Sequence, residues 1–278
     1  MKVSGKLVAQ AILKKLDKEI KNKNLHPDLA IILANNMGAS RIYVKNKIQA
    51  GERIGIKVKL FELFETEYEK CLKTIKRLNK DPEFNGIIVQ YPVYDSWNFE
   101  EIERHIDPQK DVDGFLENSP YTGATALGVW EMLTAFSLLS GFKKTEKFLQ
   151  GKNIVLIGKG KAAGRPILKL LEQKGFKVNV VDKDTENPSS IIKKGDVVIS
   201  ATGVKNIINK TNLKRGAYVV GVGIGKELVE GKEKVYGDIN EEEVSKIAKL
   251  YNPNLGGIGP LTVVSLLKNV VESAKRNK

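Results

Sequence analysis

The chain has 278 residues, 41% of them hydrophobic, which is enough apolar material for one large or two modest domains. Its single cysteine, Cys71, cannot form an intramolecular disulfide, and its two histidines lie far apart in sequence. This argues against zinc sites and histidine-based catalysis, and we expect no metal. The N-terminus lacks the apolar core of a signal peptide and no apolar run could span a bilayer, so we expect a cytoplasmic protein with no membrane partner.

The net charge of +13 allows three interpretations. It could serve nucleic-acid binding, steer anionic small molecules, or reflect a lysine-rich solvated surface. The basic residues are scattered among carboxylates, and only 7% of the chain is aromatic, with no interleaving of the two kinds. This pattern favours the solvated surface, and we expect no nucleic-acid partner.

The first half of the chain alternates predicted helices and strands. Apolar spacing and short buried-type runs predict the sequence helix, strand, helix, strand, helix, strand, which implies a mainly parallel sheet. Ser40 is a candidate N-cap for the second helix, and Gly55 follows its end. The predicted helices cover residues 7–21, 40–54 and 67–79, and the predicted strands cover 29–34, 58–64 and 86–90.

A loop at residues 116–125 separates this series from a second one. An apolar helix at 127–139 and a lysine-rich linker lead into it. The second series consists of a strand at 153–157, a helix at 164–174, and strands at 177–181, 196–201 and 217–222.

The predicted fold class is therefore α/β, with an N-terminal α/β catalytic domain and a Rossmann-type cofactor domain built on a parallel sheet. The last apolar helix, residues 261–274, is expected to return to the first domain. We assign residues 1–138 plus 260–278 to the catalytic domain and residues 139–259 to the cofactor domain.

A glycine-rich turn follows the strand that opens the second series. In NIVLIGKGKAAGRP, Gly158 would allow the tight turn, Gly160 would let backbone approach a pyrophosphate, and Gly164 would suit close helix–strand packing. The spacing is G-x-G-x-x-x-G, one residue longer than the commonest fingerprint, and similar turns occur in α/β proteins with no ligand.

The strand after this turn ends at Asp182, where a carboxylate would bond the ribose hydroxyls of NAD. Lys159 and Lys183 flank the same place and could hold the 2′-phosphate of NADP. The residues therefore indicate a dinucleotide but leave NAD and NADP both open.

Polar residues gather in three segments of the first domain. Tyr43 and Lys47 are four residues apart on one predicted helix face, and Gln90 ends a predicted buried strand. A charged loop containing Asp111 and Asp113 follows. In open α/β sheets ligands bind beyond the carboxyl ends of the strands, which is where Gln90 lies.

Read together and in order, the segments ASRIYVKNK, GIIVQYP, IDPQKDVDGF, GKGKAAGRP and NLGGIGPLT resemble the signature segments of the bifunctional methylenetetrahydrofolate dehydrogenase/methenyltetrahydrofolate cyclohydrolase family. The resemblance covers nearly the whole chain, from Gly5 to about Asn269. It implies oxidation of methylenetetrahydrofolate with NAD(P), hydrolysis of the methenyl product to 10-formyltetrahydrofolate, and a place in one-carbon metabolism. It also implies tetrahydrofolate derivatives as ligands and a homodimer formed through the cofactor domain.

The resemblance implies roles for particular residues. Lys47 would be the catalytic lysine, Tyr43 would stack on the folate, Gln90 would tune the protonation of Lys47, and Asp113 would bind the pterin ring. Further substrate contacts would come from Ser40, Pro92, Asp111, Gly257, Gly259 and Pro260. The cofactor would be bound by Gly158, Lys159, Gly160, Gly164, Arg165, Asp182, Lys183, Thr202 and Gly203.

The sequence departs from the family pattern mainly on the cofactor side. The phosphate-gripping G-R-S is replaced by GKG at 158–160, and H-S-x-T is replaced by DKDT at 182–185. We therefore expect NADP as the cofactor, with NAD possible because of Asp182. Two other hypotheses are a dehydrogenase without cyclohydrolase activity and a basic nucleic-acid-binding protein on a Rossmann scaffold.

Overall fold

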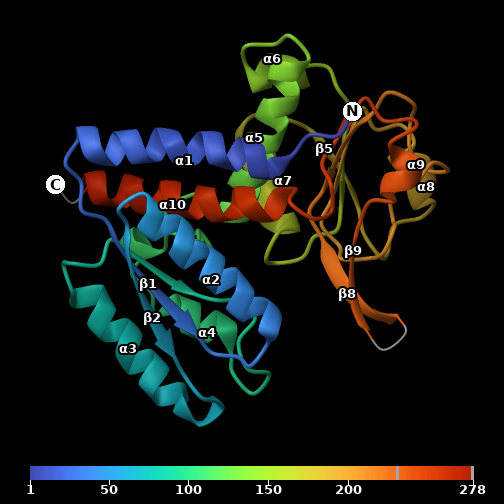
Figure 1. Ribbon diagram of the computed structural model, residues 1–278. Helices are drawn as coiled ribbons and strands as arrows, with labels where there is room; N and C mark the ends of the chain where they lie inside the picture. Colours follow the sequence, from blue (N-terminus) through green and yellow to red (C-terminus); the bar gives the residue numbers. More distant parts are fainter. Residues whose placement is uncertain (230–231, 277–278) are drawn as a thin grey trace. The chain divides into compact units, whose positions relative to one another are not determined.

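The computed structural model describes residues 1–229 and 232–276, which divide into two compact units (Figure 1). One unit consists of Gln10–Ala124 and Val263–Lys278, and we call it the three-stranded unit after its sheet. The other consists of Met1–Ala9 and Thr125–Thr262, and we call it the five-stranded unit. The predicted two-domain α/β fold is confirmed.

The sheet of the three-stranded unit has the order β2-β1-β3, and both strand pairs are parallel. Parallel neighbours require crossover connections, which α2 and α3 supply. The strands are β1 (Asp28–Leu33), β2 (Lys57–Glu62) and β3 (Gly86–Val89), and the helices are α1 (Gly5–Asn22), α2 (Gly38–Arg53), α3 (Tyr68–Lys80), α4 (Phe99–Arg104) and the short 3₁₀ segments Glu65–Glu67 and Pro108–Lys110.

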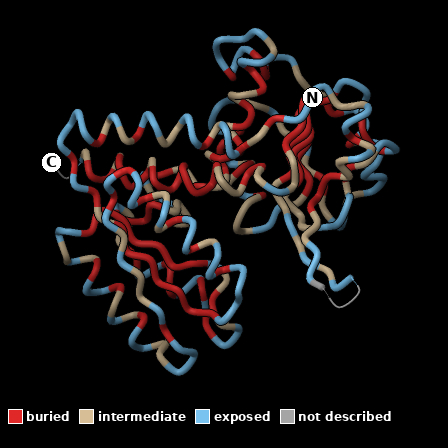
Figure 2. The backbone as a smooth tube through the Cα atoms, in the orientation of Figure 1, coloured by how far each residue is buried: buried red, intermediate tan, exposed pale blue. Residues whose placement is uncertain are grey.

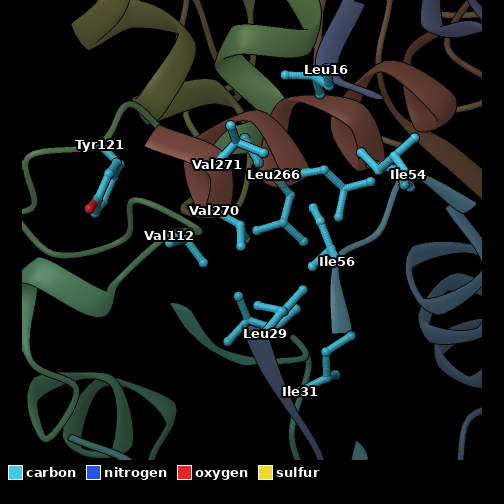
Figure 3. Packing of buried hydrophobic residues seen from close by; sticks show 14 of the residues in the cluster. Leu16, Leu29, Ile31, Ile54, Ile56, Val112, Tyr121, Leu266, Val270 and Val271 are labelled. Atoms are coloured by element: carbon cyan, nitrogen blue, oxygen red, sulfur yellow. The ribbon is translucent and has the colours of Figure 1, made fainter. Parts of the chain in front are cut away.

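Two apolar layers cover the two faces of this sheet, because successive side chains of a strand point to opposite faces. On β1, Ile31 belongs to one layer and Ile32 to the other. The C-terminal helix α10 (Ile258–Arg276) packs Leu266 and Val270 into the layer of Ile31, as Figure 3 shows. The predicted return of this helix to the first domain is confirmed.

The five-stranded unit contains a wholly parallel sheet with the order β10-β7-β6-β4-β5. Its central strands are buried throughout, as the continuous apolar runs predicted (Figure 2). The strands are β4 (Ile154–Ile157), β5 (Val178–Val181), β6 (Val197–Ser200), β7 (Tyr218–Gly221) and β10 (Leu250–Tyr251), and the helices are α5 (Ala124–Leu139), α6 (Thr145–Leu149), α7 (Gly164–Gln173), α8 (Pro188–Ile192) and α9 (Glu241–Val244).

Several features differ from the sequence-based expectation, and α4, α8, α9 and β10 are among the elements that were not predicted. The linker before Gln150 contains the short helix α6, and an antiparallel pair, β8 (Ile224–Val229) and β9 (Lys232–Gly237), was not predicted. The prediction of Ser40 as an N-cap is wrong. Helix α2 begins at Gly38 with Met37 as its N-cap, so Ser40 lies within the first turn and is buried.

In the part of the chain that the structure describes, no helix has the length and apolar character needed to cross a bilayer.

Candidate active site

Lys47 and Gln90 form the centre of a buried polar group in the three-stranded unit. The Lys47 Nζ donates a hydrogen bond to Gln90 Oε1 at 3.0 Å, and Lys47 is only 3% exposed. Gln90 follows β3, and its Nε2 donates to the backbone oxygen of Tyr91. A lysine ammonium buried with one neutral partner is poorly solvated, so its neutral form is favoured relative to water.

The sequence of α2 places Lys47 there. The inner face of the helix carries Ser40, Val44, Lys47 and Gly51, spaced three or four residues apart, and all four are buried. Val44 packs in the apolar layer of β1, and Lys47 extends the same face. The Lys47 Nζ lies 5.5 Å from the centre of the Tyr43 ring, so the predicted pair shares one side of the helix.

Asp113 interacts electrostatically with Lys47. Burial lowers the pKa of Lys47, and the Asp113 carboxylate partly opposes that shift. Burial raises the pKa of Asp113, and the Lys47 charge opposes that shift in turn. The structure therefore brings Lys47, Tyr43, Gln90 and Asp113 together, with a lysine that releases its proton more readily than in water.

Pro92 and Asp111, also predicted as substrate contacts, lie in the same unit but in different surroundings. The backbone oxygen of Pro92 accepts a hydrogen bond from Asn35 Nδ2 at 2.5 Å. Asn35 Oδ1 also accepts the Met37 N–H at 3.0 Å, so one buried side chain joins the start of α2 to the loop after β3. The sequence reasoning missed Asn35; its signal is its place one residue beyond the predicted buried strand. Asp111 is 2% exposed and is engaged by backbone amides.

The glycine-rich turn lies in the five-stranded unit between β4 and α7. Gly158 has φ +92°, and its N–H donates to the Val181 oxygen at 2.8 Å. A Cβ on Gly164 would lie 2.2 Å from the Gly158 oxygen, so only glycine allows this approach of helix to strand. The Arg165 N–H bonds to the Gly160 oxygen, and α7 begins with no side-chain cap. Amides at such a helix start can bind an anion.

Asp182 follows β5 and is already paired. The Lys159 Nζ lies 2.6 Å from Asp182 Oδ2, and Thr185 Oγ1 donates to Asp182 Oδ1 at 2.8 Å. The hydrogen bond from Lys159 is the main reason why the pKa of Asp182 is lowered, with Thr185 adding to the effect. Lys183 is exposed beside them. The negative charge that would oppose a 2′-phosphate is thus largely balanced by Lys159.

Thr202 and Gly203 follow β6, and Thr202 is held by a residue that the sequence reasoning missed. The fully buried Asp238 accepts the Thr202 N–H at 3.1 Å, the Thr202 hydroxyl at 3.1 Å and the Gly223 N–H at 3.0 Å. This one carboxylate fixes the loops that leave β6 and β7. No local pattern marks Asp238, because its partners are far away in sequence.

Gly257, Gly259 and Pro260 lie at the start of α10, in the five-stranded unit. A Cβ on Gly5 would lie 1.7 Å from the Gly257 oxygen, and the Lys6 N–H bonds to the Gly256 oxygen at 3.0 Å. The N-terminus of α1 therefore packs directly on this loop. The predicted site residues are thus divided between the two units: Ser40, Tyr43, Lys47, Gln90, Pro92, Asp111 and Asp113 in one, and the glycine-rich and cofactor residues in the other.

Within residues 1–229 and 232–276, the structure contains no group of three or more histidine, cysteine or acidic side chains that could hold a metal ion.

Comparison with known proteins covers the whole chain. Residues 3–113 match the catalytic domain of the tetrahydrofolate dehydrogenase/cyclohydrolase family, and residues 123–278 match its NAD(P)-binding domain. The bifunctional protein FolD of Staphylococcus epidermidis is 33% identical over 286 residues, covering 98% of this chain and 96% of that protein.

Two solved structures are similar over their full length. The bifunctional enzyme FolD, a methylenetetrahydrofolate dehydrogenase/cyclohydrolase from Campylobacter jejuni, superposes with a TM-score of 0.90 at 34% identity, covering 100% of this chain and 99% of that one. The Trypanosoma brucei FolD, complexed with NADP cofactor and inhibitor, gives a TM-score of 0.89 at 28% identity, covering 99% and 97%. This chain therefore belongs to the tetrahydrofolate dehydrogenase/cyclohydrolase family, and it is a bifunctional enzyme of one-carbon metabolism with an NAD(P)-binding domain.

Proposed function

We propose that Lys47 is the group that moves protons during hydrolysis of methenyltetrahydrofolate. The observation that carries this proposal is the buried hydrogen bond of 3.0 Å from Lys47 Nζ to Gln90 Oε1. Since burial lowers the pKa of Lys47, the neutral amine, which can accept a proton, is more accessible than for a lysine in water.

In the hydrolysis, water adds to the cationic methenyl carbon, and the Lys47 amine takes one proton from that water as the C–O bond forms. The resulting ammonium returns the proton to the folate nitrogen N5 as the C–N5 bond breaks. The product is 10-formyltetrahydrofolate, and the second proton of the water goes to solvent. The positive charge of the substrate would lower the pKa of Lys47 further, because like charges repel.

We assign positioning roles to the neighbours of Lys47. Gln90 Oε1 would fix the direction of the amine, and the Tyr43 ring would stack on the folate. Asp113 would bind the pterin, with Ser40, Pro92, Gly257, Gly259 and Pro260 completing the substrate contacts. In the oxidation, the dinucleotide accepts a hydride from the methylene carbon, and the protein's part is to orient the folate.

The test compares Lys47→Met with Lys45→Met, an exposed lysine on the same helix. We expect Lys47→Met to reduce methenyltetrahydrofolate hydrolysis at least about a hundredfold, the lower end of what positioned acid–base catalysis contributes. Lys45→Met should keep the wild-type rate. A Lys47→Met enzyme that hydrolyses at close to the wild-type rate would rule out the assignment.

For the cofactor we propose NADP, with NAD as a possible second substrate. The support is the ion pair of Lys159 with Asp182, which balances the negative charge of the carboxylate. The exposed Lys183 would then bind the 2′-phosphate. The Trypanosoma brucei relative was solved with NADP. The binding residues would be Gly158, Lys159, Gly160, Gly164, Arg165, Asp182, Lys183, Thr202 and Gly203.

We further propose that residues 1–138 and 260–278 form the folate-binding part and that residues 139–259 form the dinucleotide-binding part. Residues 230–231 and 277–278 of these ranges lie outside the described residues.

We propose a cytoplasmic homodimer that assembles through the cofactor domain. The exposed apolar side chains of Ile224 and Leu228 on β8, 56% and 76% exposed, support such a contact, and sedimentation of the Leu228→Lys variant would test it.

A further inference from the structure

We propose that Asp111 is a positioning residue that folds the loop 112–123 so that Asp113 faces Lys47, and that Asp111 does not itself contact the substrate. This positioning role replaces the substrate contact that the resemblance implied for Asp111. It rests on the proposed roles of Asp113 and Lys47.

Asp111 continues the sheet beyond its last strand. It forms a parallel bridge with Ile87 of β3, and the next residue, Val112, lies against Gly86, where an added Cβ would be 2.7 Å from the valine side chain. Because the bridge is parallel, the chain leaving Asp111 runs toward the carboxyl end of β3, where Gln90 lies. This register therefore places Asp113, two residues after Asp111, toward the end of β3 that Gln90 follows.

Both oxygens of the Asp111 carboxylate accept hydrogen bonds from backbone amides. Its Oδ1 accepts the Gly114 N–H at 3.1 Å, and its Oδ2 accepts the Leu116 N–H at 2.9 Å. The Ser119 hydroxyl donates to the Asp111 backbone oxygen at 3.0 Å. With 2% of its surface exposed, Asp111 has little area left for a ligand. A carboxylate bonded in this way to nearby amides fixes the path of a turn.

These bonds enclose Asp113. Asp113 lies between Asp111 and Gly114, and its backbone oxygen accepts the Ala124 N–H at 3.2 Å. Gly114 has φ +71°, and a Cβ there would lie 2.7 Å from the Gly123 nitrogen. The loop is thus closed tightly on both sides of Asp113, whose carboxylate interacts electrostatically with Lys47.

The charges around Asp111 support a structural use of this carboxylate. Asp113 is its acidic neighbour, and the adjacent Lys110 is turned away, with its Nζ bonded to the backbone oxygens of Leu78 and Asp81. Burial raises the pKa of Asp111 to about 7, and the Asp113 charge adds to that rise. Hydrogen bonds from the Leu116 amide and the Ser119 hydroxyl oppose that rise and favour the ionised form.

The experiment is a double-mutant cycle with Asp111→Asn, Asp113→Ala and the combined variant, assayed for both reactions with the full enzyme. Asp111→Asn keeps the volume but sets an NH₂ group against one of the two amide donors. Asp107→Asn is the matched control: Asp107 Oδ1 accepts the Gln109 N–H at 2.9 Å in the same segment, and asparagine retains that single acceptor. Dinucleotide binding and the melting temperature are measured on every variant.

We expect Asp111→Asn to raise the KM for folate about tenfold in both reactions, as expected when a charged hydrogen bond is lost, with kcat changed less. Asp107→Asn should match wild type. If Asp111 acts through Asp113, adding Asp111→Asn to Asp113→Ala should change KM less than about twofold, because the interaction is already gone.

Multiplying effects in the double variant would overturn the inference and leave the proposed function intact, and so would an unchanged KM in Asp111→Asn. If Asp113→Ala leaves KM unchanged, both the inference and the proposed role of Asp113 are wrong. Lys47→Met, assayed alongside, reports on the proposed hydrolysis mechanism independently.

If the melting temperature of the Asp111→Asn variant is too low for the assay, the Ser119→Ala variant is tested instead. It removes the hydroxyl that bonds the Asp111 backbone oxygen, helps stabilise the Asp111 carboxylate and accepts the Tyr121 N–H, and it should give a smaller KM increase that also disappears on Asp113→Ala. An unchanged KM for Ser119→Ala together with normal dinucleotide binding would then count against the inference.

Discussion

The two lysine–carboxylate pairs of this enzyme have opposite surroundings. Lys47 is buried beside Gln90 in the three-stranded unit, where it interacts electrostatically with the Asp113 carboxylate. Lys159 and Asp182 form a direct ion pair at 2.6 Å, with their side chains 48% and 25% exposed. Burial shifts the pKa of Lys47 downward, whereas in the exposed pair the main effect is that Lys159 lowers the pKa of Asp182.

The difference in burial between the two pairs predicts how well each pair tolerates substitution. In a buried group each polar atom needs its partner, so removing one member leaves another unsatisfied. An exposed pair is solvated whether or not it is formed, and it contributes little to stability. This agrees with the sequence: the predicted folate-side residues follow the family pattern, whereas the cofactor-side segments depart from it.

The largest effect should come from Gln90→Leu, which removes the hydrogen-bond acceptor of Lys47 and leaves the amine unoriented. We expect methenyltetrahydrofolate hydrolysis to fall about a hundredfold, the scale of acid–base catalysis, and the dehydrogenase rate to fall less. Steady-state rates of both reactions measure this, with Gln109→Leu, an exposed glutamine, as the control. An equal loss in both reactions would show that Gln90 does not act through Lys47.

Asp238→Ala should lower stability rather than chemistry. It leaves the part-buried Thr202 and Gly223 amides without their acceptor, and we expect the free energy of unfolding to fall by about 2–4 kcal/mol. Denaturant titration gives the value, and the exposed Asp184→Ala should match wild type. An unchanged midpoint for Asp238→Ala would mean that these loops do not depend on the carboxylate.

Asp113→Asn should shift the pH dependence of hydrolysis. The Asp113 carboxylate raises the pKa of Lys47, so removing its charge lowers that pKa. The limb of the pH–rate profile that reports Lys47 should therefore move to lower pH. Hydrolysis rates measured across pH at saturating substrate test this, with the exposed Asp95→Asn as control. A limb that moves to higher pH would contradict the assigned interaction.

The smallest effect should come from Asp182→Ser, since its ion pair is exposed. The melting temperature should stay the same, while the ratio of kcat/KM for NADP to that for NAD should rise, because a carboxylate that favours ribose hydroxyls over phosphate is lost. Lys159→Met should lower the same ratio. A ratio that stays constant in both variants would place the ribose away from this pair.

Much of the fold follows from local patterns. The apolar runs at β1, β3, β4, β6 and β7 predicted buried parallel strands because such strands bury both faces. Helix α2 was predicted within two residues at its start, but its N-cap was misassigned, since an N-cap preference is weaker than the packing that buries Ser40. The β8–β9 pair escaped prediction because its residues are mostly exposed and carry no continuous apolar run.

The sequence by itself determined the family and the parallel α/β architecture and led to the proposal of Lys47, Tyr43, Gln90 and Asp113, because these depend on short segments whose order along the chain can be read directly. Only the tertiary structure decided that Asn35 binds the loop at Pro92, that Asp238 anchors Thr202 and Gly223, and that Asp111 faces amides rather than solvent. Most of these contacts join segments far apart in sequence, and a polar side chain takes its role from whichever donors folding brings to it.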